Sequence, residues 1–178
     1  MSETNEKKFP RMTEKDRKRF SDPVEAAKWL LGKVICRKLP DGEIVRLNIT
    51  ETEAYYYEDE ACYGHGGKIT KDNKPLFGKC GTGCAFGTMF LIVCGDEGRS
   101  DNVLIRSAGN EQVYFNGPYK IYDGLQLKNF RSVDLLTSDD LWLETDGKER
   151  QFCTTERKNL SKNTKPEFKN LKHRFIIL

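Results

Sequence analysis

The sequence predicts a single α+β domain that is rich in short β-strands. Strand-like segments outnumber helix-like ones along the chain, and no internal repeat or low-complexity linker divides it. A length of 178 residues with 37% hydrophobic side chains is enough for one core. The first twenty residues are polar and lack hydrophobic periodicity, so we expect a flexible basic arm over residues 1–20 and one folded domain over residues 21–178.

The first element expected is a helix that begins near Ser21-Asp22-Pro23 and ends at Gly32. A Ser or Asp side chain can accept hydrogen bonds from the free amides of the first turn, and proline is tolerated there because that turn has no use for its missing N–H. Glycine often follows the last helical residue because it adopts the left-handed backbone conformation without steric cost. These signals together predict one short helix.

A β-hairpin is expected after this helix. Two strand-like segments, residues 33–38 and 43–52, flank Pro40-Asp41-Gly42, a sequence that is typical of a tight turn. Further along the chain we expect buried strands at residues 88–94 and 103–106, a short helix within residues 117–127, and strands at the end of residues 135–144 and at residues 174–178.

The charge of the chain is unevenly distributed. The total is only +3, but residues 1–20 carry a net charge of +3, residues 21–147 one of −6 and residues 148–178 one of +6. Binding to a polyanion such as DNA depends on local rather than total positive charge, so the two basic ends are candidate contacts with phosphates. A solvated basic tail is the simpler interpretation when charge alone is considered.

Composition excludes several classes of protein. No run approaches the roughly 20 apolar residues of a membrane helix, and the polar N-terminus lacks the apolar region of a secretion signal. The six cysteines are therefore expected to be reduced thiols in an intracellular protein. A zinc site made by Cys62, His65, Cys80 and Cys84 is disfavoured because only one cysteine pair has suitable spacing, so we expect no metal.

The segment with the most chemical information is residues 49–67. A predicted strand ends there with Glu51 and Glu53, whose side chains share one face because strand side chains repeat every second residue. Three consecutive tyrosines and an acidic run follow. Aromatic rings beside a carboxylate can stack on a flat ligand, attract positive charge on it and exclude water, which makes the carboxylate a better base. The alternative is a strand end whose tyrosines cover the core while the acids face solvent, and composition alone favours this alternative.

Several segments of the chain resemble the alkyladenine (3-methyladenine) DNA glycosylase family in their order and spacing. They are LLGK (30–33), ITETEAY (49–55), EDEACYGHGGKIT (58–70), LFGKCGT (76–82), VLIRS (103–107), NGPYKI (116–121) and HRFIIL (173–178). The most specific part is the ETEAY core followed by an acidic run, a glycine pair and a Phe-Gly, and the spacing is loosest after residue 127.

The resemblance implies an enzyme that binds damaged duplex DNA, flips an alkylated or deaminated purine out of the stack and hydrolyses its N-glycosidic bond. It implies that Glu53 is the general base that activates the attacking water, and that Tyr55 stacks on the flipped base. It also implies that Arg106 and Lys120 contact the DNA backbone. The structural alternatives for these two residues are an ion pair at a strand end and an ordinary surface lysine.

The chain departs from the family pattern at the pocket wall. The family usually places a histidine where this chain has Tyr63, and His65 follows two residues later. We expect Tyr63 to take over the wall with a phenol in place of an imidazole, unless a loop shift brings His65 in. Phe86 falls on the family's second stacking aromatic, where it keeps the ring and loses the hydroxyl.

Two further departures concern the wedge and the choice of base. Met89 falls on the tyrosine that the family inserts into the duplex, and methionine can also part base steps. A core methionine in an apolar strand is an equal alternative. Asp96 falls where the family has an asparagine that excludes guanine. A carboxylate would instead accept a hydrogen bond from the exocyclic amine, so we expect a different or relaxed purine selectivity.

We therefore expect a monofunctional purine DNA glycosylase of base excision repair, folded as a single α+β domain with a curved antiparallel sheet and a few peripheral helices. It is expected to act as a monomer on double-stranded DNA with damaged purines, without a cofactor, a metal or a membrane. Its expected location is the nucleus in a eukaryote, and otherwise the cytoplasm with the nucleoid. The alternative is a family member that has lost catalysis and only binds damaged DNA.

Overall fold

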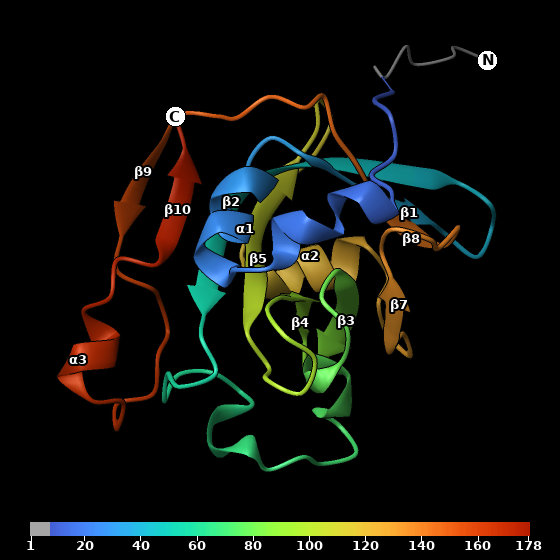
Figure 1. Ribbon diagram of the computed structural model, residues 1–178. Coiled ribbons are helices and arrows are strands. Elements are labelled where there is room, and N and C mark those ends of the chain that lie inside the picture. The colour runs from blue at the N-terminus through green and yellow to red at the C-terminus, as the bar shows by residue number, and fades with distance from the viewer. Residues whose placement is uncertain (1–7) are drawn as a thin grey trace.

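A ten-stranded sheet organises the structure, a computed structural model that describes residues 8–178 (Figure 1). The strands are β1 (Val34–Lys38), β2 (Ile44–Tyr55), β3 (Thr82–Phe86), β4 (Met89–Val93), β5 (Asn102–Gly109), β6 (Tyr114–Asn116), β7 (Ser132–Asp134), β8 (Leu141–Glu144), β9 (Phe152–Thr155) and β10 (Arg174–Ile177). The α-helices are α1 (Pro23–Leu30), α2 (Pro118–Gly124) and α3 (Pro166–Lys169), and 3₁₀ turns cover Glu14–Phe20, His65–Gly67 and Lys74–Phe77. The strands pair antiparallel, which confirms the expected fold class.

Strand β2 is the centre of the sheet, because it pairs with β1, β5 and β10. Its hairpin with β1 is the one expected from the turn at residues 40–42. The register between β2 and β5 shifts between Ile49 and Glu51 and again between Glu51 and Thr52. Irregularities of this kind bend a strand and increase its twist. They therefore add curvature to the sheet where β2 carries its glutamates.

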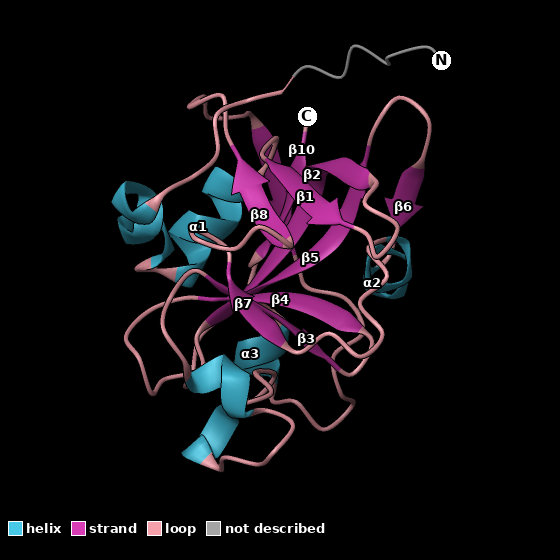
Figure 2. Cartoon of the chain, turned by 90° about the vertical axis from the view of Figure 1, so that its right-hand side faces the viewer, coloured by secondary structure: helices cyan, strands magenta, loops and turns pink. Residues whose placement is uncertain are grey.

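Helix α1 begins and ends as the sequence predicts. The Asp22 carboxylate accepts hydrogen bonds from the amides of Val24 at 2.9 Å and Glu25 at 3.0 Å, which satisfies two free donors of the first turn. Gly32 lies just beyond the helix at φ +75°, a conformation that costs glycine little. The apolar face of α1 packs against β2 and β5, and Figure 2 shows α1 and α2 on opposite sides of the strands.

Strand β3 and four shorter elements were not anticipated from the sequence. Strands β6, β7 and β9 and helix α3 have only three or four residues each. A segment of that length is too short to display a period of 2 or 3.6, so its conformation depends on the partner strand or on the contacts of the neighbouring chain.

The N-terminal residues differ from the flexible arm expected over residues 1–20. Residues 1–7 of that arm lie outside the described part of the chain. Beyond them, the amide of Met12 donates to the carbonyl of Leu143 at 2.8 Å, and the side chains of Met12 and Phe20 belong to the main core. Met12 and Phe20 are isolated apolar residues in a polar segment, so they give no hydrophobic periodicity in the sequence. Both are nevertheless buried in the folded protein.

We expect Phe20→Ala to destabilise the fold strongly. The Phe20 side chain is fully buried, and removing it leaves a cavity as well as losing hydrophobic transfer energy, which together cost about 3–5 kcal/mol. The free energy of unfolding in urea measures this loss. Lys15→Ala, at an exposed position of the same 3₁₀ turn, is the matched control and should change stability by less than about 0.5 kcal/mol. Equal effects of the two substitutions would contradict a packed N-terminal segment.

Candidate active site

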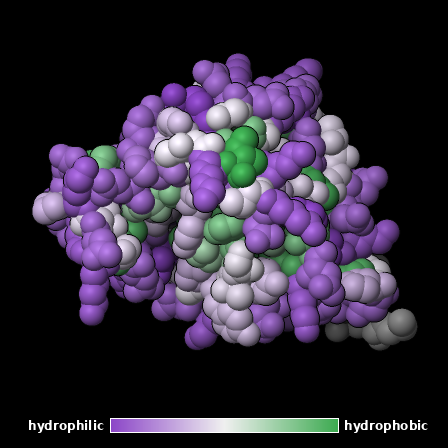
Figure 3. Space-filling model, turned by 90° about the horizontal axis from the view of Figure 1, so that it is seen from below, coloured by the Kyte–Doolittle hydropathy of each residue, from purple (hydrophilic) through white to green (hydrophobic). Residues whose placement is uncertain are grey.

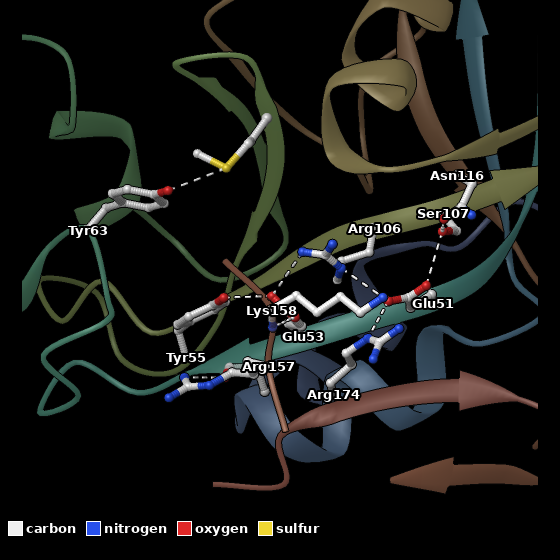
Figure 4. A network of polar contacts seen from close by, with 12 residues as sticks. Glu51, Glu53, Tyr55, Tyr63, Arg106, Ser107, Asn116, Arg157, Lys158 and Arg174 are labelled. Atoms are coloured by element: carbon white, nitrogen blue, oxygen red, sulfur yellow. Dashed lines mark hydrogen bonds and ion pairs between the residues drawn. The ribbon is translucent and has the colours of Figure 1, made fainter. Parts of the chain in front are cut away.

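The second half of β2 holds two carboxylates inside the protein (Figure 4). Glu53 has no exposed surface. Its Oε2 accepts a hydrogen bond from the Tyr55 hydroxyl at 2.6 Å and a longer one from Arg106 Nη1 at 3.5 Å. Its Oε1 accepts a hydrogen bond from the backbone amide of Lys158 at 2.7 Å. These three donors come from different elements, so together they hold the carboxylate in one orientation.

The tyrosine hydroxyl beside Glu53 is a permanent donor. Burial and the neighbouring carboxylate raise the pKa of Tyr55 far above its usual value, so its hydroxyl stays protonated at neutral pH. Glu53 and Tyr55 share one face of β2, because they are two residues apart. The alternation that the sequence shows in ETEAY is thus the cause of this hydrogen bond.

Glu51 is held by arginines. Its Oε1 accepts hydrogen bonds from Arg106 Nε at 3.1 Å and Arg174 Nε at 2.5 Å, and its Oε2 accepts one from the Ser107 hydroxyl at 3.1 Å. Burial alone would raise the pKa of Glu51, but the hydrogen bonds and charges of the two arginines outweigh burial and lower that pKa below its ordinary value. Glu51 is therefore an anion that ties β2 to β5 and β10.

The segment between β9 and α3 completes the site, and sequence analysis missed it. We refer to residues 157–161 as the closing segment. Arg157 is buried at its start, and its guanidinium carbon lies 4.5 Å from the centre of the Tyr55 ring. Lys158 follows and donates its amide to Glu53, which is 105 residues earlier in the chain. The only sequence signal here is the net positive charge of residues 148–178, and it does not single out either residue.

A cavity of about 460 Å³ lies beside the two carboxylates. Its wall includes Tyr55 and Arg106, which contact Glu53 directly, together with Lys158 and Leu160 of the closing segment. Tyr63 and Met89 line it as well. A cavity of this size can hold a small aromatic ligand, and its wall offers aromatic surface beside a buried carboxylate.

The structure brings Tyr63 to this cavity and leaves His65 outside its wall. The Tyr63 hydroxyl lies 3.5 Å from the Met89 sulfur, and its ring centre is 4.9 Å from that of Phe86. Phe86 does not line the cavity itself but packs its ring against that of Tyr63. His65 is exposed, with its Nδ1 3.3 Å from the Tyr57 carbonyl oxygen.

The remaining residues expected at the site are scattered. Asp96 is exposed in the loop after β4 and is not part of the cavity wall. Lys120 is exposed on α2, whose first residue, Pro118, does line the cavity. Arg106 is almost completely buried, and its guanidinium bridges Glu51 and Glu53 instead of facing solvent. The ion pair considered above as an alternative is present, but in the middle of β5 and not at a strand end, and Arg106 also lines the cavity.

The described residues offer no obvious site for a metal. Within residues 8–178, His, Cys, Asp and Glu side chains form no cluster of three or more that could hold an ion. The six cysteines are free thiols, and burial raises the pKa of Cys84 to about 12. In the same part of the chain, no helix has the length and apolar character needed to cross a membrane.

Comparisons with known proteins agree on one family. The family model described as methylpurine-DNA glycosylase matches residues 17–178. A Borreliella burgdorferi protein, provisionally named 3-methyladenine DNA glycosylase, is 34% identical over 139 residues, which cover 70% of this chain and 74% of that protein. The mouse DNA-3-methyladenine glycosylase is 31% identical over 155 residues, or 70% of this chain and 46% of its own length. The human protein of the same name is 30% identical and covers 70% of this chain and 52% of itself.

We expect Glu51→Gln to lower stability at neutral pH by about 3 kcal/mol, because it leaves buried arginine charge without its partner. The folded-state pKa of Glu51 lies below the ordinary value of 4.5, so its contribution is present above that pH and is lost as pH falls through the lowered pKa. The gap in unfolding free energy between wild type and variant should therefore be constant near neutrality and close at acid pH.

Glu25→Gln is the control for this experiment. Its ion pair with Lys28 lies on the surface of α1, where such pairs contribute less than about 1 kcal/mol. A gap for Glu51→Gln that persists unchanged to pH 3 would show that the charge of Glu51 does not stabilise the fold.

Proposed function

This chain belongs to the methylpurine-DNA glycosylase family, and we propose that it removes alkylated or deaminated purines from duplex DNA with Glu53 as the general base. The observation that carries the proposal is the position of Glu53: a buried carboxylate, oriented by three donors, directly behind the wall of a cavity of about 460 Å³.

The reaction needs few groups. Glu53 takes a proton from a water molecule as the water oxygen attacks C1′ of the sugar, and the bond between C1′ and the purine nitrogen breaks. The bonding electrons leave with the base, so a cationic alkylated purine departs as a neutral molecule, whereas a neutral deaminated purine departs as an anion and takes up a proton from solvent. Because Glu53 is fully covered, we infer that the Arg106 side chain in the cavity wall moves aside when the nucleotide enters, while the Tyr55 hydroxyl and the Lys158 amide keep their hydrogen bonds to Glu53.

The aromatic residues have separable roles in the proposal. Tyr55 stacks on the flipped base, and Tyr63 forms the opposite wall in place of His65, since only Tyr63 lines the cavity. Phe86 supports the Tyr63 ring. Met89 begins β4 directly after the turn of the β3–β4 hairpin, which suits a wedge that enters the base stack. An electron-rich wall favours cationic purines, which attract aromatic rings.

DNA is expected to lie across the end of the molecule that carries residues 56–77 and α3. This face is mainly hydrophilic with scattered apolar residues (Figure 3). Lys120 on α2 and Lys158 in the closing segment are exposed and suit phosphate contacts, whereas Arg106 acts on the carboxylates.

We further propose that the protein works as a monomer, in the nucleus of a eukaryotic cell or with the nucleoid of a bacterium. The effect of Asp96 on purine selectivity stays a prediction.

The alternative is a protein that binds damaged DNA without cutting it. The substituted wall residues allow this reading. The intact environment of Glu53 argues against it, because a protein that only binds DNA has no use for a buried, fully oriented carboxylate next to its cavity.

We expect Glu53→Gln to abolish base release while leaving DNA binding intact. The amide cannot take a proton from water, so the single-turnover rate constant should fall by at least about 10²-fold. The measurement is the appearance of abasic sites in a duplex that carries hypoxanthine or 3-methyladenine, alongside the dissociation constant for the same duplex. If the wild type releases no alkylated or deaminated purine, catalysis is refuted and the binding alternative stands.

Lys120→Ala should weaken DNA binding without changing the rate of base release at saturating enzyme. A phosphate contact releases counterions, so the slope of log K against log salt should become less steep by about 0.9. Lys38→Ala on β1 serves as the control, because this exposed lysine lies on a strand that contributes nothing to the cavity. A salt slope unchanged in Lys120→Ala would remove this residue from the interface.

A further inference from the structure

A buried ion pair next to the site has no role in the reaction described so far. Arg157 Nη1 lies 2.5 Å from Asp59 Oδ2, and both side chains are almost completely shielded from solvent, at 0% and 2% exposure. Two buried charges lose their hydration, and such a pair is a poor source of stability compared with apolar residues of the same size.

The arginine joins four separate parts of the chain. Besides Asp59, its Nη1 donates to the carbonyl of Ala54 at 3.1 Å and its Nη2 to the carbonyl of Phe168 in α3 at 2.8 Å. Its guanidinium also stacks on the ring of Tyr55. One side chain thus connects the end of β2, the acidic run that follows β2, helix α3 and its own closing segment.

The next residue carries this arrangement to the reaction centre. The amide of Lys158 donates to Glu53 Oε1 at 2.7 Å, while Tyr55 and Arg106 donate to Oε2. The Lys158 amide belongs to the planar peptide that begins at the Arg157 carbonyl, so anchoring Arg157 restricts where this amide can point. Tyr55, the other short donor to Glu53, is the residue on which Arg157 stacks. Two of the three hydrogen-bond donors to Glu53 therefore depend on the Arg157 guanidinium.

We propose that the Asp59–Arg157 pair is a positioning device for the general base: it locks the closing segment so that the Lys158 amide and the Tyr55 hydroxyl orient Glu53. This inference rests on the proposed function. It assigns neither Asp59 nor Arg157 a contact with DNA or with the flipped purine. It also assigns a purpose to the acidic run after ETEAY, in which Asp59 is the buried member.

Two conservative variants test the proposal. Arg157→Lys keeps the charge but cannot reach Asp59 and both carbonyls at once, because an ammonium lacks the planar fork of a guanidinium. Asp59→Asn keeps the size of the side chain but removes its charge. We expect each variant to lower the single-turnover rate constant roughly 10- to 100-fold, part of the range for general-base catalysis, with the dissociation constant for lesion DNA unchanged.

The pH profile separates positioning from mere destabilisation. An N–H donor favours the ionised carboxylate, so a misplaced Lys158 amide should move the acid limb of the rate profile to higher pH. The control is Arg46→Lys. Arg46 lies in the first half of β2, at the end away from Glu53, and pairs with buried Glu144 of β8. This control should lose stability without shifting the acid limb. Thermal unfolding of all three variants gives the folded fraction against which the rates are normalised.

The outcomes are distinct. A rate that falls only in proportion to the folded fraction, with an unchanged acid limb, overturns the positioning role, as does a loss confined to DNA affinity. If Arg157→Lys does not fold, Asp59→Asn decides the question by the same readouts. If the wild type releases purines and Glu53→Gln does not, failure of the two variants to alter the profile refutes this inference alone. If the wild type releases none, the proposed function itself fails.

Discussion

A carboxylate that leaves water for a protein interior loses its hydration, at a cost of several kcal/mol unless other donors replace the water. Strand β2 buries two carboxylates only two residues apart, so mutual repulsion adds to this cost. Arg106 touches both acids, Arg174 touches Glu51, and a backbone amide touches Glu53. The elements that supply these donors, β5, β10 and the closing segment, are therefore fixed relative to β2, and the cavity forms where they meet.

Glu51 and Glu53 have different neighbours, and these neighbours suit Glu51 to a structural role and Glu53 to the proposed role of general base. Glu51 faces two arginines at short range, and taking a proton would sacrifice both ion pairs. Glu53 has two short bonds from neutral donors and one longer contact with an arginine. Glu51 is thus held in ion pairs that join β2 to β5 and β10, whereas Glu53 has one cationic contact and lies behind the cavity wall.

Sequence reasoning reached the features that local patterns determine. The alternation in ETEAY placed Glu51 and Glu53 on one face of a strand, and the cap at Asp22 placed the start of α1. It could not reach the partners supplied from the far end of the chain, since nothing in the residues around Arg157 or Lys158 shows periodicity or a motif. The burial of Phe20 was not predicted for a similar reason, because a single apolar residue in a polar segment does not indicate which core it joins.

The groups that compensate the charges of Glu51 and Glu53 are far apart in the sequence, and the ribosome therefore makes them at different times. A ribosome that has made residues up to 150 has already produced both glutamates and Arg106, but neither the Lys158 amide nor Arg174. Until those residues leave the exit tunnel, β2 lacks its third neighbour, β10, and two charges that the finished protein buries remain only partly compensated. The nascent sheet is thus expected to stay open at this edge, and the cavity to close only after residues 158 and 174 have emerged from the ribosome.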